Sequence, residues 1–187
     1  MKKLLMTLLA ISTAILANAQ AEQTFKPFKV DIASGYALPS GEGAKAGGLF
    51  AIEPKYALND NFTVGLRAEL ALTVQGTMGG EAVNADVKGS GSYLGTLDYY
   101  FNTNSFRPFV GAGAGIFTNA SANANSSTQT SSDVKSGSRF GFTPRAGFET
   151  GHFRLAVEYN VAGKTLNVNH NYIGMKIGFF LGGGRYE

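Results

Sequence analysis

The sequence of 187 residues has no cysteine and no tryptophan, and it contains only two histidines and five prolines. Without cysteine, disulfide bonds, thiol chemistry and a lipoprotein-type lipid anchor are all excluded. The two histidines, His152 and His170, stand well apart, so the sequence does not spell out a transition-metal site. We therefore expect no metal ion and no other cofactor.

An excess of one charge is also missing once the N-terminus is set aside. The chain holds 16 Lys and Arg against 13 Asp and Glu, a formal charge of +3. Two of the 16 are Lys2 and Lys3, which leaves 14 against 13 from residue 20 onward. No basic patch remains, and we expect no nucleic-acid partner.

The only long apolar run lies at the N-terminus. Lys2 and Lys3 precede the run 4–16, and Ala17-Asn18-Ala19 follows it. These are the positive region, apolar region and small-x-small cleavage site of a secretory signal peptide. The run is too short for a transmembrane helix, although a retained interfacial helix is an alternative. We predict a signal peptide over 1–19 and one β-barrel domain over 20–187.

Period-2 alternation of apolar and polar residues then recurs eight times, which is typical of β-strands. In the clearest segment, 62–75, every second residue from Phe62 to Val74 is apolar, whereas the intervening positions include Arg67 and Glu69. The eight expected strands are 28–38, 49–58, 62–75, 92–101, 107–117, 139–149, 153–161 and 171–181.

The connections between these segments alternate in length. The polar turns 59–61, 102–106 and 150–152 are short, whereas the others are longer, up to the Ser-, Thr- and Asn-rich segment 118–137, which we expect to be a mobile loop. Short periplasmic turns and long extracellular loops are typical of outer-membrane barrels. The sequence thus predicts an all-β fold, an eight-stranded antiparallel up-and-down transmembrane β-barrel, with both termini in the periplasm.

The apolar face of each strand should point outward, because an eight-stranded barrel leaves an interior barely wide enough for side chains. For 107–117, where the pattern is ambiguous, we favour Val110, Ala112, Ala114 and Ile116 as the outer face. Aromatic residues gather at both strand ends, as in the two girdles that flank the apolar band of a membrane barrel. A soluble two-sheet sandwich that buries the large apolar face remains an alternative.

The other face carries six positive and six negative residues within the expected strands. Buried charges are tolerated when they are paired and hydrogen-bonded, so we expect ion pairs that plug the lumen. The candidates are Lys29, Asp31, Glu53, Lys55, Arg67, Glu69, Asp98, Arg145, Glu149, Arg154, Glu158 and Lys176.

Three segments carry a family resemblance: Arg107 to Gly115 (RPFVGAGAG), Tyr93 to Phe101 (YLGTLDYYF) and Tyr172 to Phe180 (YIGMKIGFF). With them, residues 25–182 resemble the small eight-stranded outer-membrane barrels: the outer-membrane protein A transmembrane domain, the opacity-type proteins and the porin-like barrels of bacteroidetes. The resemblance implies a monomer in the outer membrane of a Gram-negative cell, in contact with lipid and lipopolysaccharide and inserted by the barrel-assembly machinery.

The chain departs from this family pattern in three ways. No peptidoglycan-binding domain follows the barrel, and a short polar tail from Gly182 to Glu187 replaces the usual terminal aromatic residue. Pro54 and Pro144 fall inside strands, where each removes a ladder hydrogen bond. We expect a β-bulge at each proline.

Two functions fit the sequence. The favoured one is a non-enzymatic barrel that serves envelope structure, adhesion or interaction through its extracellular loops. The alternative is a porin-like conduit for small solutes or apolar molecules. The deacylases that share this architecture carry a His-x-Ser motif, whereas this chain has His170-Asn171-Tyr172, and His152 lies in a short turn. We therefore expect no enzymatic activity.

Overall fold

The computed structural model describes residues 24–40, 44–79, 82–124, 135–165, 168–169 and 171–186. The predicted signal peptide, 1–19, lies outside the described residues, so its cleavage stays a prediction. Among the residues that are described, no helix is long and apolar enough to cross a membrane.

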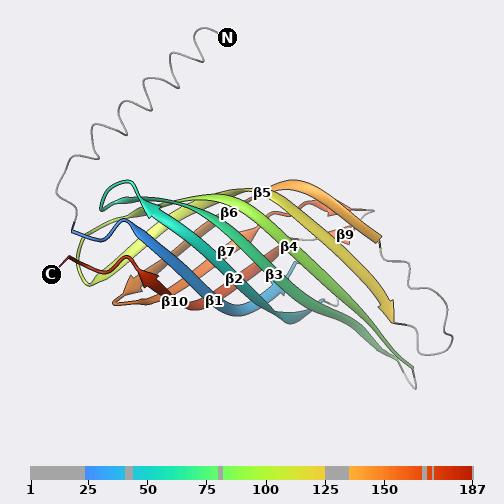
Figure 1. The fold of residues 1–187 in the computed structure, drawn as a ribbon. Helices are drawn as coiled ribbons and strands as arrows, with labels where there is room; N and C mark the ends of the chain where they lie inside the picture. The colour runs from blue at the N-terminus through green and yellow to red at the C-terminus, as the bar shows by residue number, and fades with distance from the viewer. Residues whose placement is uncertain are drawn as a thin grey trace, which may run out of the picture.

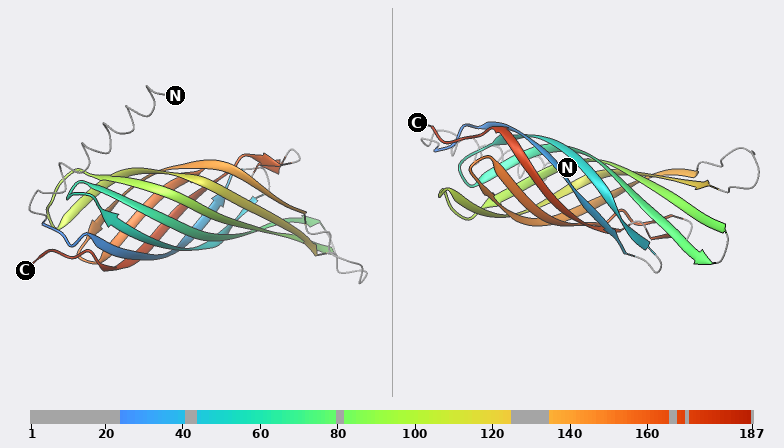
Figure 2. Two further views of the ribbon diagram at one scale, coloured as in Figure 1. Left: turned by 45° about the horizontal axis from the view of Figure 1, so that its top comes forward. Right: turned by 90° about the horizontal axis from the view of Figure 1, so that it is seen from below.

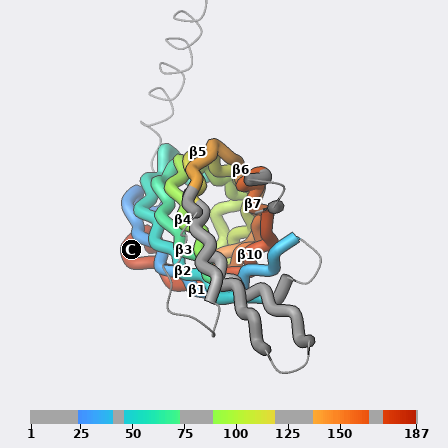
Figure 3. The backbone as a smooth tube through the Cα atoms, turned by 90° about the vertical axis from the view of Figure 1, so that its right-hand side faces the viewer, coloured from blue at the N-terminus to red at the C-terminus, as the bar shows by residue number. Residues whose placement is uncertain are grey.

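Eight long strands close into one barrel, in which neighbours along the chain pair antiparallel and β1 closes on β10 (Figures 1 and 3). A separate two-stranded pair, β8 and β9, lies in the connection between β7 and β10. The closed barrel confirms the predicted fold class and excludes the two-sheet sandwich. The strands are β1 (Phe28–Pro39), β2 (Ala44–Ala57), β3 (Phe62–Gly79), β4 (Ala82–Tyr100), β5 (Phe106–Ala124), β6 (Lys135–Thr150), β7 (Phe153–Asn160), β8 (Lys164–Thr165), β9 (Val168–Asn169) and β10 (Tyr172–Gly182).

The strands β2 to β6 are longer than expected, and they extend at the end away from the short turns. At the short turns, observed and expected ends agree within about a residue, but the β3–β4 ladder continues to the pair Gly79–Ala82. The β4–β5–β6 ladders also continue past the barrel rim, so this side of the molecule extends beyond the other strands (Figure 2). The expected loop is therefore wrong over 118–124 and 135–137, while 125–134 lies outside the described residues. Such polar ladders need no apolar face, which is why hydrophobic periodicity misses them.

The predicted bulges at Pro54 and Pro144 are wrong. The β2–β3 ladder is interrupted between the pairs Ile52–Ala68 and Lys55–Gly65, yet the register is the same on both sides. At Pro144 the β6–β7 ladder is interrupted in the same way, between the bridge Phe142–Val161 and the pair Arg145–Glu158. Proline removes one donor but does not add a residue, so the strand accommodates it by a lost hydrogen bond. The bulge in these ladders lies elsewhere, between Lys45 and Gly48.

The large apolar side chains point outward, as the alternation predicts. Leu66 and Phe140 are among the most exposed, and the exposure of Val110 and Ile116 confirms the facing expected for β5. Exposed aromatic side chains lie toward the two ends of the strands, with mostly aliphatic ones between. A surface this apolar suits hydrocarbon and not water. The exposed aromatic residues include Phe28, Tyr56, Phe62, Tyr99, Phe101, Phe106 and Phe179 toward the short turns, and Tyr36, Phe50, Tyr93, Phe140 and Tyr159 toward the long connections.

Candidate functional site

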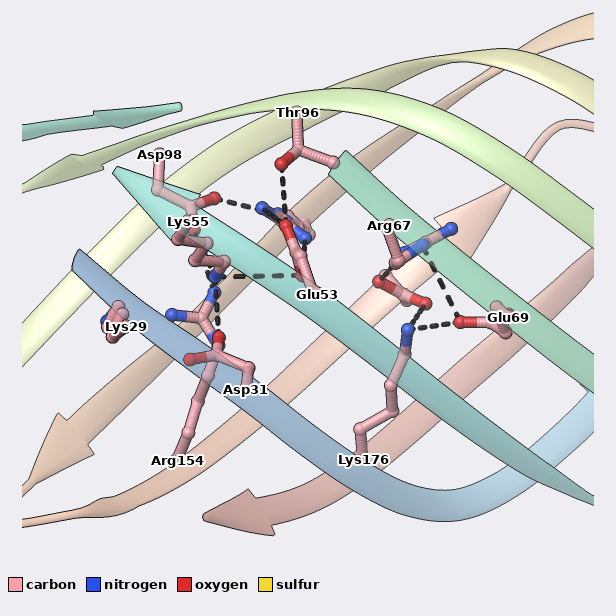
Figure 4. Close-up of polar contacts among 12 residues, drawn as sticks. Lys29, Asp31, Glu53, Lys55, Arg67, Glu69, Thr96, Asp98, Arg154 and Lys176 are labelled. Carbon is pink, nitrogen blue, oxygen red and sulfur yellow. Dashed lines mark hydrogen bonds and ion pairs between the residues drawn. The ribbon is translucent and has the colours of Figure 1, made fainter. Parts of the chain in front are cut away.

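The inward face of the barrel gathers the charged residues of strands that are far apart in the sequence. The structure places all twelve predicted lumen residues inside the barrel, and each is buried and within ion-pair distance of at least one oppositely charged side chain. They fall into two groups along the barrel axis (Figure 4). The first, here the eight-charge cluster, consists of Lys29, Asp31, Glu53, Lys55, Asp98, Arg145, Glu149 and Arg154; the second, the four-charge cluster, consists of Arg67, Glu69, Glu158 and Lys176.

Asp98 on β4 is the centre of the eight-charge cluster. Its carboxylate accepts hydrogen bonds from Lys55 Nζ at 2.9 Å, Arg145 Nε at 2.7 Å and Arg154 Nη2 at 2.9 Å. Asp98 is fully buried, so each of these charge-assisted hydrogen bonds lies out of contact with water. One carboxylate thus joins the strands β2, β4, β6 and β7 across the lumen.

The remaining members of this cluster extend it in two directions. The Arg145 guanidinium donates two parallel hydrogen bonds of 3.0 and 2.7 Å to the Glu53 carboxylate, and Thr96 Oγ1 donates to the same carboxylate at 2.6 Å. Toward the short turns, Glu149 pairs with Lys29 at 2.5 Å and also with Arg154. The bidentate Arg145–Glu53 pair fixes orientation as well as charge.

The four-charge cluster lies nearer the long connections. Arg67 donates to Glu158 at 2.5 Å, and Lys176 contacts both Glu69 and Glu158. Neutral groups complete it: Asn160 accepts from Arg67 at 3.0 Å, and Tyr172 donates its hydroxyl to Glu69 at 2.5 Å. These contacts connect β3, β7 and β10 through the interior.

Each cluster is electrically neutral when its ionisable groups are charged: four positive with four negative groups, and two with two. No ion pair joins one cluster to the other within the described part of the chain. Between them lies a cavity of about 20 Å³, lined by Glu53 and Arg145 from one cluster and Glu158 and Lys176 from the other. A space of that size holds about one water molecule.

Small inward residues make room for these long side chains. Gly111 on β5 faces Asp98, and a Cβ atom at Gly111 would overlap the Asp98 carboxylate and come within 2.6 Å of the Leu97 carbonyl oxygen. A Cβ atom at Gly65 would likewise come within 2.9 Å of Lys55 Cγ. The glycines of the inner face therefore provide volume for the ion pairs.

Apolar side chains close the lumen beyond both clusters. Toward the long connections, Leu49 packs with Tyr172, and Leu94 packs with Phe117. Toward the short turns, the rings of Tyr100 and Phe109 contact each other in a tilted arrangement, with 5.6 Å between their centroids. Sequence alternation assigns these residues to the inner face, but periodicity alone does not reveal that they form layers.

The short-turn mouth is covered by a feature that the sequence did not reveal. Residues 24–26 and 184–186, here called the terminal clasp, pair through Lys26 N to Gly184 O at 2.9 Å and Tyr186 N to Thr24 O at 3.0 Å. Asp60, in the turn between β2 and β3, accepts from the backbone amides of Thr24 and Phe25 at 3.0 and 3.2 Å. The clasp thus holds the Phe25 side chain, which is buried, in the mouth of the barrel.

His152 is not part of these clusters. His152 lies exposed in the turn between β6 and β7, with its ring 5.3 Å from that of Phe180. His170 lies outside the described residues. No group of three or more His, Cys, Asp or Glu side chains suited to a metal ion occurs where the structure is described.

Comparison with known proteins identifies the architecture. A family model described as "Outer membrane protein beta-barrel domain" matches residues 6–181. Among solved structures, Neisserial surface protein A is 18% identical, with a TM-score of 0.60 over 83% of this chain and 96% of that one. Ail, the attachment invasion locus protein of Yersinia pestis, solved in complex with the heparin analogue sucrose octasulfate, is 13% identical, with a TM-score of 0.56 over 86% of this chain and 100% of that one. No curated protein matches. At these identities the likeness to the solved structures shows the fold alone.

Proposed function

The chain belongs to the outer membrane protein beta-barrel domain family and is an outer-membrane barrel, and from that premise we propose that it is a non-enzymatic barrel with a plugged lumen. In this proposal the barrel is a rigid anchor, and its binding functions, whether adhesion, interaction or envelope structure, reside at the long-connection rim. The observation that carries the proposal is the pair of neutral, buried ion-pair clusters across the lumen.

The filling of the lumen supports closure to solutes. Both clusters bridge strands from opposite sides of the wall, and the cavity between them has room for about one water molecule. Eight-stranded barrels of this diameter are filled by side chains, whereas water-filled channels need about sixteen strands. A solute would have to break several charge-assisted hydrogen bonds in sequence, which favours the plugged barrel over the porin-like conduit.

The long ladders support a role in interaction. The strands β3 to β6 continue well past the girdle residues Tyr93 and Phe140, so a sheet of backbone projects beyond the lipid-facing band (Figure 2). Loops and projecting ends on a rigid scaffold commonly carry binding. By its name, the similar Yersinia pestis protein serves attachment, and we propose an analogous use of this end here.

The orientation in the membrane follows from the same asymmetry. Both described ends of the chain lie at the short-turn rim, where Phe25 pairs with Arg185. Since short turns face the periplasm in barrels of this kind, we propose that both termini are periplasmic. Contact with lipid and lipopolysaccharide, insertion by the barrel-assembly machinery and a monomeric state complete the proposal.

Planar-bilayer recording of the refolded mature protein tests the plugged lumen. We expect no steady current above the protein-free bilayer, and a sixteen-stranded porin under the same conditions provides the positive control. A large, steady and ohmic single-channel current would assign the protein to the conduit class instead.

A further inference from the structure

A second cavity lies at the short-turn mouth, where it borders the eight-charge cluster at Glu149. It has a volume of about 130 Å³ and is bounded by the terminal clasp on one side and the β6–β7 turn on the other. A cavity of about 150 Å³ is large enough for a benzene-sized molecule, so this one has room for a small ligand. Its polar lining comprises Ser105, Arg107, Glu149, His152 and Arg185.

Arg107 makes this cavity unusual. Seven cationic side chains are buried in the described residues, and six of them form ion pairs, but Arg107 forms none. Its guanidinium stacks between the rings of Phe25 and Tyr100, at 3.8 and 4.2 Å from their centroids. Glu149, opposite it in the β5–β6 ladder, and Asp60 attract it electrostatically, but neither carboxylate makes an ion-pair contact with it. Burying a cation without such a contact is costly, so the position favours a negatively charged ligand.

The Arg107 side chain also has a hydrogen-bond donor without a partner. Its Nη2 atom donates to the Asp60 carbonyl oxygen at 2.6 Å, whereas its buried Nε atom has no hydrogen-bond partner. Only 8% of the residue is exposed. A buried N–H group that lacks an acceptor costs free energy, and a small movement of this side chain would direct it to an acceptor in the cavity.

A second arginine and a histidine also line the cavity. Arg185 and His152 are exposed and come from separate segments, so they can approach a ligand from different sides. Glu149 carries the opposite charge, but Lys29 and Arg154 already pair with it. The cavity is therefore net positive, and it is open to molecules at the rim through its exposed residues.

We propose that this cavity, here called the mouth site, binds a phosphate group. Arginine side chains suit phosphate because their planar N–H forks match its oxygens. Donors from Arg107 and the Ser105 hydroxyl, from His152 and from Arg185 come from three separate segments, which fits a tetrahedral anion better than a planar one. Free inorganic phosphate and the headgroup of a membrane lipid share this chemistry.

Phosphate titration of the refolded mature protein in detergent tests the mouth site. Binding is followed by calorimetry with inorganic phosphate at constant ionic strength, with chloride as the balancing ion. Arg185→Gln removes an exposed positive charge and His152→Ala removes an exposed donor, so both should leave the fold intact, and we expect the double variant to bind at least about tenfold more weakly. Arg139→Gln, which removes an exposed arginine near the opposite rim, is the matched control and should bind like the wild type.

A parallel titration with a short-chain phosphatidic acid identifies the source of the phosphate. Tighter binding of the lipid than of inorganic phosphate, lost in the double variant, indicates a headgroup site, and the reverse order indicates free phosphate; either supports the mouth site. Saturable binding of neither probe overturns the proposal. Binding that is undiminished in the double variant, or weakened equally by Arg139→Gln, also overturns it.

Discussion

Arg67 illustrates how a single buried charge contributes to the stability of this barrel. Its guanidinium is 2% exposed and contacts Glu158, Glu69 and Asn160. Replacing it with alanine would leave the four-charge cluster with two carboxylates and one ammonium group, in a place that water scarcely reaches. Removing one partner of a buried ion pair costs about 3–5 kcal/mol.

We therefore expect Arg67→Ala to lower the free energy of unfolding by about 3–5 kcal/mol. Arg139→Ala removes the same side chain from an exposed position and should change it by less than about 1 kcal/mol. Urea unfolding in lipid vesicles measures both variants. Equal, small effects would show that the four-charge cluster is hydrated and that its pairs contribute as surface pairs do.

Gly111, which faces the lumen, and Gly95, which faces outward, allow a test of inward volume with an outer-face control. Both lie in the β4–β5 ladder, but a Cβ atom at Gly111 would meet the Asp98 carboxylate, whereas at Gly95 the nearest atom is 3.9 Å away. Gly111→Ala should therefore destabilise the barrel by about 1–3 kcal/mol through overpacking, and Gly95→Ala should be nearly neutral. Thermal unfolding in detergent compares the two; an equal loss at both positions would contradict the packing of Asp98 against β5.

At the residue level, the sequence predicted which charges face inward but not which charges meet. Alternation assigned each strand a face, and the equal numbers of both signs indicated pairing. The partners of Arg67 and Arg145 lie about 90 residues away, at Glu158 and Glu53. Their meeting depends on the stagger of the closed barrel, which no single strand contains. The division into clusters of eight and four could not be predicted for the same reason.

Substitutions on the outer face of β3 can test whether that face lies in the membrane. Leu66 lies on its outer face with 70% of its surface exposed, midway between the girdles, and Phe62 lies on the same face at the short-turn girdle. An arginine at the bilayer midplane costs about 2–4 kcal/mol, falling to about 0–1 kcal/mol near the interface. We expect Leu66→Arg to impair folding into vesicles far more than Phe62→Arg, measured as the free energy of unfolding. Similar costs at the two depths would mean that this face does not lie in hydrocarbon.

The strand ends show where periodicity stops being informative. Alternation of apolar residues reports the part of a strand that lies in lipid, and it predicted the short-turn ends well. Beyond the girdle, the ladder continues from the pair Leu72–Gly89 to the pair Gly79–Ala82. The extension includes only the short alternation Val83-Asn84-Ala85-Asp86-Val87-Lys88, with small apolar residues, and the predicted membrane-spanning apolar faces did not include it. The prolines were misjudged because a lost donor interrupts a ladder without shifting its register.

The whole molecule closes its lumen in successive layers. From the short-turn mouth inward these are the terminal clasp with Phe25, the Tyr100–Phe109 layer, the two ion-pair clusters and the apolar groups at Leu49 and Leu94. The balanced inward charges predicted a filled barrel, but the clasp depends on residues 24–26 pairing with 184–186 and on Asp60 accepting from the Thr24 and Phe25 amides. Residues 24–26 and 184–186 are short segments with little periodicity, so the sequence did not predict that they would pair.

Because several layers close the lumen one after another, removing the terminal clasp alone should not open a path through the barrel. Phe25→Ala/Asp60→Ala deletes the buried ring and the carboxylate that accepts the Thr24 and Phe25 amides, so the mouth should open. The ion-pair clusters do not contact the deleted groups, and the cavity between them still admits only about one water molecule. We therefore expect this variant to show lower thermal stability than the wild type but no steady current in planar bilayers. Unchanged unfolding would show that the clasp adds little to stability, whereas an ohmic current would identify the clasp, and not the ion pairs, as the barrier that closes this barrel.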